Sequence, residues 1–594
     1  MNGTASASFK GISVQRASPC KGTELARPLP EILLLVVLTS TFVAYIATLW
    51  FPFIFDDVLQ IIQNPFINSW TQVPGYFSAE IWNKGWGTAG GAASFYRPIF
   101  FIWLLLNRTL FGLHAWGWHL TVTLAHVGVT FLVYRLALKL SKDRWTALIA
   151  AMIFGLHPIH VEAVAWISGA TEPLLSLLFL GSLLALISYQ QKNLARLFGV
   201  SLGIFLVALF TKETALALPG VVIAYEIIFY EGISEADRSD WVSRSRARCK
   251  IIFPFLALTV FYIVVRRLVF SSFPSAVSKI PAKTMALTWP SVLEFYIKHL
   301  VWPEKLSVFY DTPFVTQATF LRFWLPLSIV VVTTAVLLLI AIYSRIRLVT
   351  FGVLWMLITI LPNLNFRVFQ WREIAHDRYL YLPSVGFAML LAIAIRRMPV
   401  ACAHLIKAPA LQSVYVCLLG IILGVSTVGQ STVWVSPLSL YSHAASIAPN
   451  NAGALYLLAG EFVARGDIQH ATAIDQRLIL IAPNWGEAWL QLGTVSFRSG
   501  KNEQAEAQLL RATDLDKSSA AGFYWLGLSY YKSHKLREAE AAFRHAIALE
   551  PSGEGFHLAL GSVLKEMGNP QTATAEFQKE LQYYPETQVR ANKL

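Results

Sequence analysis

The chain has 594 residues, of which 55% are hydrophobic and 14% are charged. Such an apolar composition excludes an ordinary water-soluble protein, because the excess apolar side chains need contact with lipid. The formal net charge of +13 does not require a nucleic-acid partner, since membrane proteins concentrate Lys and Arg in their cytoplasmic loops. The cysteines Cys20, Cys249, Cys402 and Cys417 have no CxxC spacing, which argues against a zinc site or a disulfide framework.

Residues 1–30 are predicted to be a cytoplasmic tail, and residues 31–430 a polytopic, all-α membrane domain. A spanning helix needs about 20 apolar residues, with basic residues at its cytoplasmic end. The first apolar run is too long for a cleaved signal peptide and is interpreted as a retained anchor. Eleven segments are predicted to span the membrane: 31–52, 116–138, 145–164, 172–190, 195–211, 214–230, 251–270, 323–343, 348–362, 379–395 and 411–429.

The basic loops predict the orientation of the membrane domain. If the basic N-terminus is cytoplasmic, five later clusters fall on the same side. These clusters are Lys139/Lys142/Arg144, Lys192/Arg196, Arg244/Arg246/Arg248/Lys250, Arg345/Arg347 and Arg396/Arg397. The agreement requires the apolar stretch 97–113 to lie along the outer surface, which its internal Asn107 and Arg108 favour. An odd number of spans then places the C-terminal tail outside the cytoplasm.

Residues 431–594 are predicted to form a separate extracytoplasmic domain of helical repeats. The prolines Pro449, Pro483, Pro551 and Pro585 are spaced by 34 residues or by a multiple of it. A period of about 34 residues is that of the tetratricopeptide repeat, an α-solenoid unit. Four repeats are placed at 452–485, 486–519, 520–553 and 554–587, and they are expected to bind an acceptor or protein partners.

Polar side chains are predicted at the outer ends of several helices, where a charge must be solvated, paired or functional. They are Asp56 and Asp57; Arg97; His157, His160 and Glu162; Lys212 and Glu213; and Asp377, Arg378 and Tyr379. The two aspartates are either solvated loop acids, a general base toward a hydroxyl acceptor, or ligands of a divalent cation. A guanidinium binds phosphate in a bidentate way, so Arg97 and Arg378 suit a lipid phosphate.

Two of these groups have alternative interpretations. His157 and His160 have the spacing of metal ligands, but Pro158 interrupts the helix and no further ligand is evident. A hydrogen-bonded helix end or a substrate contact is therefore favoured over a metal. Lys212 and Glu213 are either an internal ion pair or part of a polar pocket.

Five motifs together resemble one known family. They are Phe55-Asp56-Asp57 with Asn64-Pro65, Tyr96-Arg97-Pro98, residues 155–164, Lys212-Glu213 and residues 377–384. In this order, and with the repeats attached, they resemble the transmembrane and tetratricopeptide-repeat-containing O-mannosyltransferases and their bacterial relatives. One departure is Ala170-Thr171-Glu172, because the family usually has an arginine followed by an acid after Ser168-Gly169.

The resemblance implies a membrane fold of the GT-C type, with a polyprenyl-phosphate sugar entering from the bilayer. Carried onto matching positions, it implies that Asp56 or Asp57 is the catalytic carboxylate and that Arg378 holds the donor phosphate. The predicted function is transfer of a mannose-like sugar to a hydroxyl of a protein or glycan acceptor, on the extracytoplasmic side of a bacterial inner membrane or its equivalent. The alternatives are a non-catalytic scaffold that recruits partners through its repeats, and a transporter or flippase, for which the sequence shows no internal symmetry.

Overall fold

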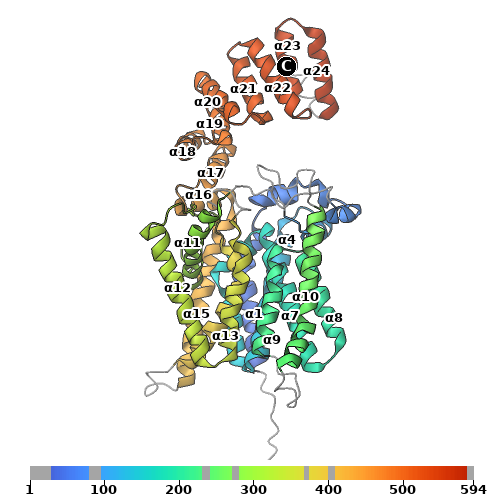
Figure 1. The fold of residues 1–594 in the computed structure, drawn as a ribbon. Coiled ribbons are helices and arrows are strands. Elements are labelled where there is room, and N and C mark those ends of the chain that lie inside the picture. The colour runs from blue at the N-terminus through green and yellow to red at the C-terminus, as the bar shows by residue number, and fades with distance from the viewer. Residues whose placement is uncertain are drawn as a thin grey trace, which may run out of the picture.

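The computed structural model describes residues 29–78, 95–229, 241–269, 280–366, 374–398 and 408–584. These ranges form a bundle of helices, followed by an array of helix pairs that projects from one end of the bundle (Figure 1). The prediction of an all-helical membrane protein with a helical-repeat domain is confirmed for these residues. Most of the predicted N-terminal tail and the last residues of the fourth predicted repeat lie outside the described residues.

Seven helical segments of the described chain are long and apolar enough to cross a membrane, and each coincides with a predicted span. They are Pro30–Trp50, Ala115–Ser141, Ile167–Lys192, Ser245–Val269, Phe320–Ser344, Arg347–Leu364 and Gln412–Val435. An eighth span is formed if Arg144–Leu156 and Pro158–Ala165, which meet at an angle of 49°, are counted as one. Proline has no N–H to continue the first helix, so Pro158 accounts for the bend. The chain is therefore a multi-pass membrane protein.

The other three predicted spans form short helices, which corrects the predicted number of eleven full spans. They are α8 (Ala195–Leu209), α9 (Leu218–Ile228) and α14 (Pro383–Arg397). At 1.5 Å per residue they are roughly 16 to 23 Å long, shorter than a hydrocarbon core of about 30 Å. Short 3₁₀ turns, η7 (Glu213–Ala217) and η12 (Asp377–Leu380), precede α9 and α14. Charged residues of the predicted site therefore lie where these helices stop short.

Two further helices complete the end of the bundle near the repeats. The segment predicted to lie along the surface forms α3 (Pro98–Phe111), which packs on α4 (Ala115–Ser141). Helix α11 (Ala282–Val301), which was not predicted, packs on α12 (Leu325–Ser344) and on η12. Its Lys283, Glu294 and Lys298 interrupt the apolar pattern on which the prediction of spans rested.

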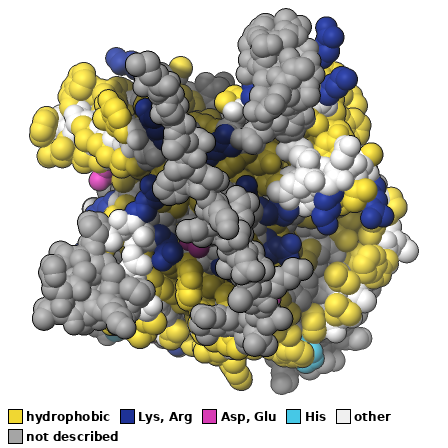
Figure 2. Space-filling view, turned by 90° about the horizontal axis from the view of Figure 1, so that it is seen from below, with side chains coloured by type: hydrophobic (Ala, Val, Ile, Leu, Met, Phe, Trp, Pro, Cys, Tyr) yellow, Lys and Arg dark blue, Asp and Glu magenta, His cyan; other side chains and the backbone are white. Residues whose placement is uncertain are grey.

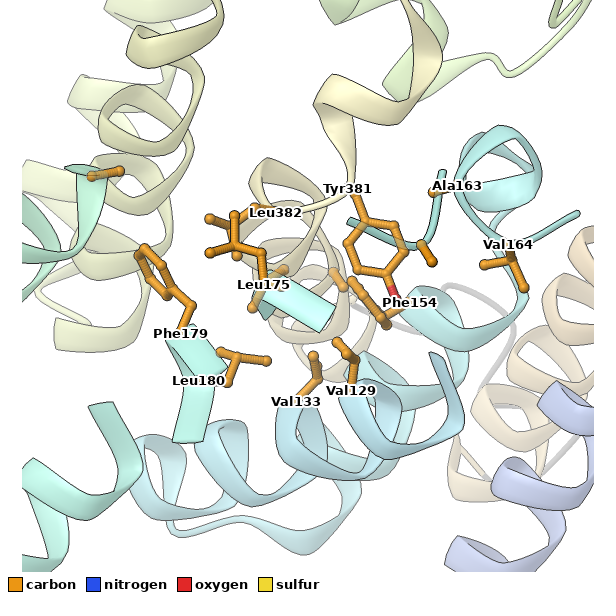
Figure 3. Packing of buried hydrophobic residues seen from close by; sticks show 14 of the residues in the cluster. Val129, Val133, Phe154, Ala163, Val164, Leu175, Phe179, Leu180, Tyr381 and Leu382 are labelled. Atoms are coloured by element: carbon orange, nitrogen blue, oxygen red, sulfur yellow. The ribbon is translucent and has the colours of Figure 1, made fainter. Parts of the chain in front are cut away.

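Buried apolar side chains hold the centre of the bundle together (Figure 3). They come from α4, α5 (Arg144–Leu156), α7 (Thr171–Lys192) and the start of α14, and include Val133, Phe154 and Phe179. Helix α14 also lies close to α13 (Arg347–Ile360), because Gly386 and Gly352 face each other. A Cβ atom on Gly386 would lie 2.6 Å from the carbonyl oxygen of Gly352. In lipid there is no hydrophobic driving force between helices, so helices associate by close packing at small residues such as glycine.

The C-terminal array consists of four helix hairpins preceded by α16 (Pro437–Ile447). The pairs are α17 (Ala452–Ala464) with α18 (Ile468–Ile481), α19 (Gly486–Arg498) with α20 (Asn502–Leu515), α21 (Ala520–Lys532) with α22 (Leu536–Leu549), and α23 (Phe556–Glu566) with α24 (Pro570–Tyr583). In the last three pairs a glycine of the first helix faces a large apolar residue of the second: Gly493 with Leu509, Gly527 with Phe543, and Gly561 with Phe577. A Cβ atom at these glycines would lie 2.5 to 2.7 Å from the facing side chain.

The first hairpin has an acid where the others have Leu509, Phe543 or Phe577. Asp475 occupies that register position and is fully buried. Neither of its carboxylate oxygens has a hydrogen-bond partner within the described part of the chain. Burial raises the pKa of Asp475 to about 8, so the carboxyl is mostly protonated in the folded protein at neutral pH.

Asp475 should make the stability of the repeats depend on pH. The unfolded chain releases this proton near pH 4 and the folded chain only near its pKa of about 8, so the free energy of unfolding should fall as pH rises between these values. The slope is at most about 1.4 kcal/mol per pH unit. Urea unfolding of a fragment of residues 436–594, followed by circular dichroism from pH 5 to pH 8, measures it. Asp475→Asn should remove the slope, and an unchanged slope in that variant would contradict the assignment.

Candidate active site

The loop after the first span is fixed by aromatic contacts. Helix α1 (Leu29–Tyr45) and η1 (Ile46–Trp50) lead into residues 51–57. Phe55 has a φ of 55°, a left-handed conformation that is uncommon for a bulky residue and that is often found at functional sites. Its ring centroid lies 5.4 Å from that of Trp166, 5.7 Å from Phe309 and 6.5 Å from Tyr441. Three distant segments therefore hold the backbone immediately before the two aspartates.

Asp57 has a structural role. Its side chain is fully buried, and Oδ1 accepts hydrogen bonds from the backbone N–H of Ser168 at 2.8 Å and from its hydroxyl at 2.6 Å. The backbone N–H of Ile54 donates to Oδ2 at 3.3 Å. Burial raises the pKa of Asp57 to about 7, against the lowering effect of these hydrogen bonds. With both oxygens engaged, Asp57 ties the loop to the turn before α7.

Asp56 differs from its neighbour because its carboxylate is half-buried and receives no hydrogen bond from any described residue. Burial raises its pKa to about 6, while the positive charge of Arg378 lowers it. The group is therefore largely a carboxylate at neutral pH and has both oxygens available. Of the two predicted catalytic acids, Asp56 is the one whose carboxylate oxygens receive no hydrogen bond from the described residues.

Arg378, in η12, is held beside this loop. Its Nη1 donates to Glu162 of α6 (Val161–Ala165), and its backbone N–H donates to the other carboxylate oxygen at 2.8 Å. The guanidinium carbon lies 5.2 Å from the centre of the Trp166 ring and 5.1 Å from that of Tyr379. Within the described chain, Nε and Nη2 donate no hydrogen bond. The fixed guanidinium thus keeps donors for an anion.

Asp377, a predicted substrate contact, is hydrogen-bonded to a neighbouring segment. The hydroxyl of Tyr310 donates to its two oxygens at 2.8 and 2.7 Å, and the backbone N–H of Ser307 donates at 3.2 Å. Burial raises the pKa of Asp377 well above its usual value. The other side of this segment contacts the repeats, because Nδ2 of Asn451 donates to the carbonyl of Tyr310 at 3.2 Å. Residues 306–311, which we call the contact segment, therefore lie between the site and the repeats.

Lys212 and Glu213 are neighbours that pair with different partners. The ammonium of Lys212 bonds to Glu172, and the carboxylate of Glu213 accepts from Nε and Nη2 of Arg97 at 3.1 and 2.9 Å. Arg266 lies 4.0 Å from the second oxygen of Glu213. Lys212 also lies 5.6 Å from the centre of the Tyr379 ring. The structure thus shows a layer of crossed ion pairs, in which Glu172 and Arg266 are members that the sequence analysis missed.

The two predicted histidines join helices within the bundle. His157 accepts from the backbone N–H of Ile159 through Nδ1 at 3.2 Å, so its Nε2 carries the proton and donates to the carbonyl of Leu300 at 3.1 Å. His160 shares a hydrogen bond of 2.8 Å with the hydroxyl of Ser384. The two rings therefore hydrogen-bond to different segments of the chain. The described residues contain no group of three or more His, Cys, Asp or Glu that could hold a metal ion.

An apolar groove runs from the site toward the opposite end of the bundle. It has a volume of about 540 Å³ and lies between α11, α12, α13 and α14. Tyr296 and Leu380 line it near Tyr379, with which they share a small core, and Ile346 and Arg397 line the far end. Leu380, two residues after Arg378 in the sequence, therefore lines the near end of the groove, which continues along the membrane-spanning helices.

Comparisons with known proteins identify relatives for both parts of the chain. The tetratricopeptide-repeat family model matches residues 486–519 and 520–552. A solved structure of MamA is 23% identical, with a TM-score of 0.24, over 25% of this chain and 88% of that protein. A protein O-mannosyl-transferase of Caenorhabditis elegans is 27% identical over 72% of this chain and 59% of its own length.

Two vertebrate proteins show the same likeness. Protein O-mannosyl-transferase TMTC3 of Mus musculus is 24% identical over 93% of this chain and 64% of its own length. Protein O-mannosyl-transferase TMTC1 of Homo sapiens is 25% identical over 77% of this chain and 55% of its own length. The chain spans about three fifths of the length of these relatives. The chain is therefore similar to proteins named protein O-mannosyl-transferases, the activity of the family that its sequence motifs resemble, and part of its C-terminal array matches the tetratricopeptide repeat.

Proposed function

We propose that this chain transfers a mannose-like sugar from a polyprenyl phosphate to a hydroxyl of a protein acceptor. The observation that carries this proposal is that the ring of Trp166 contacts both the fixed guanidinium of Arg378 and the ring of Phe55, the residue before Asp56. The carboxylate of Asp56 receives no hydrogen bond from the described residues, and the positive charge of Arg378 lowers its pKa. The names of the homologues support a mannosyl transfer. The reaction is proposed for the end of the bundle from which the repeats project (Figure 1).

The apolar groove supports a lipid-linked donor. A polyprenyl chain is a long hydrocarbon, and the groove offers it apolar walls such as Leu293, Leu300 and Phe387. Because the groove begins beside Tyr379, a chain lying in it would present its phosphate next to Arg378. The Nε and Nη2 donors, which make no hydrogen bond to the described residues, then match a phosphate, which accepts two parallel hydrogen bonds from a guanidinium.

The proposed reaction is a single displacement. The carboxylate of Asp56 accepts the proton of the acceptor hydroxyl as its oxygen forms a bond to the anomeric carbon of the sugar. The bond between that carbon and the phosphate oxygen breaks, and the leaving polyprenyl phosphate keeps the electron pair. Arg378 stabilises the charge that develops on the phosphate. Attack opposite to the leaving group inverts the configuration at the anomeric carbon.

The other predicted residues support this arrangement from further away. Glu162 orients Arg378, Asp57 positions the loop, and Tyr379 flanks the guanidinium. Arg97 and Lys212 are each already paired with an acid, so we propose that they set the potential of the site and do not bind the phosphate as free cations. A divalent cation at the aspartates would have only Asp56 as an available ligand, because Asp57 is engaged by Ser168.

Replacing the two aspartates should separate catalysis from folding. Asp56→Asn removes the base, so transfer of radiolabelled mannose from a mannosyl polyprenyl phosphate should fall by about 100-fold or more in membranes with matched expression. The thermal stability of that variant should stay near wild type. Asp57→Asn places an amide against the N–H donors of Ser168 and Ile54, and it should lower the free energy of unfolding by about 1 to 3 kcal/mol. Full transfer by Asp56→Asn would refute the mechanism.

The role of Arg378 can be tested without removing its charge. Arg378→Lys keeps a cation beside Glu162 but loses the planar fork that binds phosphate, so kcat/KM for the lipid-linked donor should fall by at least about tenfold. Arg465→Lys, the same change in an exposed ion pair with Glu461, should leave it unchanged. Equal effects of the two variants would argue against a phosphate contact at Arg378.

The orientation of the chain is also a proposal that can be tested. A phosphatase reporter that is active only outside the cytoplasm should be active when fused after Gly429 or Leu594. The same reporter should be inactive when inserted between Arg244 and Lys250, because basic loops stay in the cytoplasm. The reverse pattern of activity would place the proposed site on the cytoplasmic side and would exclude an extracytoplasmic acceptor.

A further inference from the structure

A second cavity, unlike the proposed active site in its charge, opens at the end of the bundle opposite the repeats. Its volume is about 780 Å³. Six cationic side chains line it: Lys139, Lys142, Arg345, Arg347, Arg396 and Arg397. Figure 2 looks onto this face and shows Lys and Arg side chains gathered around its middle, with apolar side chains toward its periphery. We call this hollow the basic cavity.

Among the described residues, the basic cavity has far more cations than acids. Asp143 is the one acid in its described lining, and it lies 3.4 Å from Nε of Arg396. The same carboxylate already accepts from the backbone N–H groups of Trp145 and Thr146 at the start of α5. By contrast, Arg97, Lys212 and Arg378 at the proposed active site are each paired with an acid.

Helix ends account for some of this charge but not for its arrangement. Cations are favoured at helix C-termini by the macrodipole, and they gather in cytoplasmic loops. These effects explain Lys142 after α4, Arg345 after α12 and Arg397 at the end of α14 one at a time. They do not explain why three separate helix ends surround one hollow, in which Asp143 is the one acid among the described lining residues. Within the described residues, Lys142, Arg345 and Arg397 have no ion pair.

The basic cavity is continuous with the apolar groove. Ile346, Ile393 and Arg397 line both. A ligand that fills the cavity therefore meets an apolar channel at its inner wall, between α12, α13 and α14. A basic cavity that opens into an apolar groove suits an amphiphile with an anionic head and a hydrocarbon chain. A soluble anion would contact only the cationic side chains. Basic pockets between transmembrane helices are a known form of head-group site.

We propose that the basic cavity binds the phosphate head group of a membrane lipid, whose hydrocarbon chain enters the adjoining end of the groove. Arginine guanidinium groups bind phosphate oxygens in a bidentate way. We therefore expect the cavity to bind an anionic phosphate head group more tightly than a zwitterionic one, in which a cationic group cancels the phosphate charge. This site lies at the far end of the bundle from Asp56 and Arg378, and it does not depend on the proposed reaction.

Native mass spectrometry of the purified full-length chain measures this binding. The probe is dioleoyl phosphatidic acid, compared with dioleoyl phosphatidylcholine, which has the same chains but a zwitterionic head. Wild type should bind phosphatidic acid more tightly. The double variant Arg345→Gln with Arg397→Gln should lose about tenfold in affinity for it. The matched control, Lys283→Gln with Arg322→Gln, removes two exposed cations that do not line the cavity and should keep wild-type affinity.

Two further measurements decide between a lipid and a free anion. Ile346→Trp narrows the join between cavity and groove without changing charge, so it should weaken phosphatidic acid and leave binding of sodium phosphate unchanged. Sodium phosphate that binds wild type as tightly as the lipid would overturn the assignment to a lipid. An equal loss in the control double variant, or equal affinity for both lipids, would overturn the site itself. If the arginine variant fails to fold, as judged by size-exclusion chromatography, Ile346→Trp still tests the proposal.

Discussion

The ion pair of the buried Glu162 with the partly buried Arg378 joins the bent helix pair of residues 144–165 to the turn before α14. Burying two charges costs several kcal/mol per ion, and the pair is tolerated only when further hydrogen bonds and geometry compensate. Here the backbone N–H of Arg378 supplies such a bond to Glu162, and two aromatic rings flank the guanidinium. Trp166 also contacts Phe55. The position of the loop of residues 51–57, which carries Asp56 and Asp57, therefore depends on the ion pair of Glu162 with Arg378.

Two adjacent carboxylates take different roles because their environments differ. Asp57 is enclosed and has three hydrogen bonds, whereas Asp56, one residue earlier, is half-buried and has none from the described chain. The left-handed conformation of Phe55 turns the backbone at this point. In this arrangement Asp57, which is fixed by hydrogen bonds, holds the neighbouring Asp56 in place.

Much of the architecture can be predicted from the sequence, since apolar periodicity and a period of 34 residues are local patterns. What cannot be predicted are pairings between distant residues. Lys212 finds Glu172 and Glu213 finds Arg97, although Lys212 and Glu213 are themselves adjacent. Hydropathy likewise does not show that α9 and α14 are too short to cross the membrane. Each is preceded by a 3₁₀ turn whose amino-acid composition is similar to that of an α-helix. The choice between Asp56 and Asp57 depends on Ser168, which is more than a hundred residues away.

The contact segment has a consequence for how repeat arrays can be exchanged between proteins of this architecture. Leu306 accepts hydrogen bonds from Gln430 and His443, and the carboxylate of Asp311 accepts from the backbone N–H of Asn450. The first residues of the repeat domain are therefore part of the support of the membrane domain. A chimera joined before α16 would strip His443, Asn450 and Asn451 from residues 306–311, whereas one joined after the first hairpin would keep them. Recombination should thus vary the outer repeats and retain the innermost one.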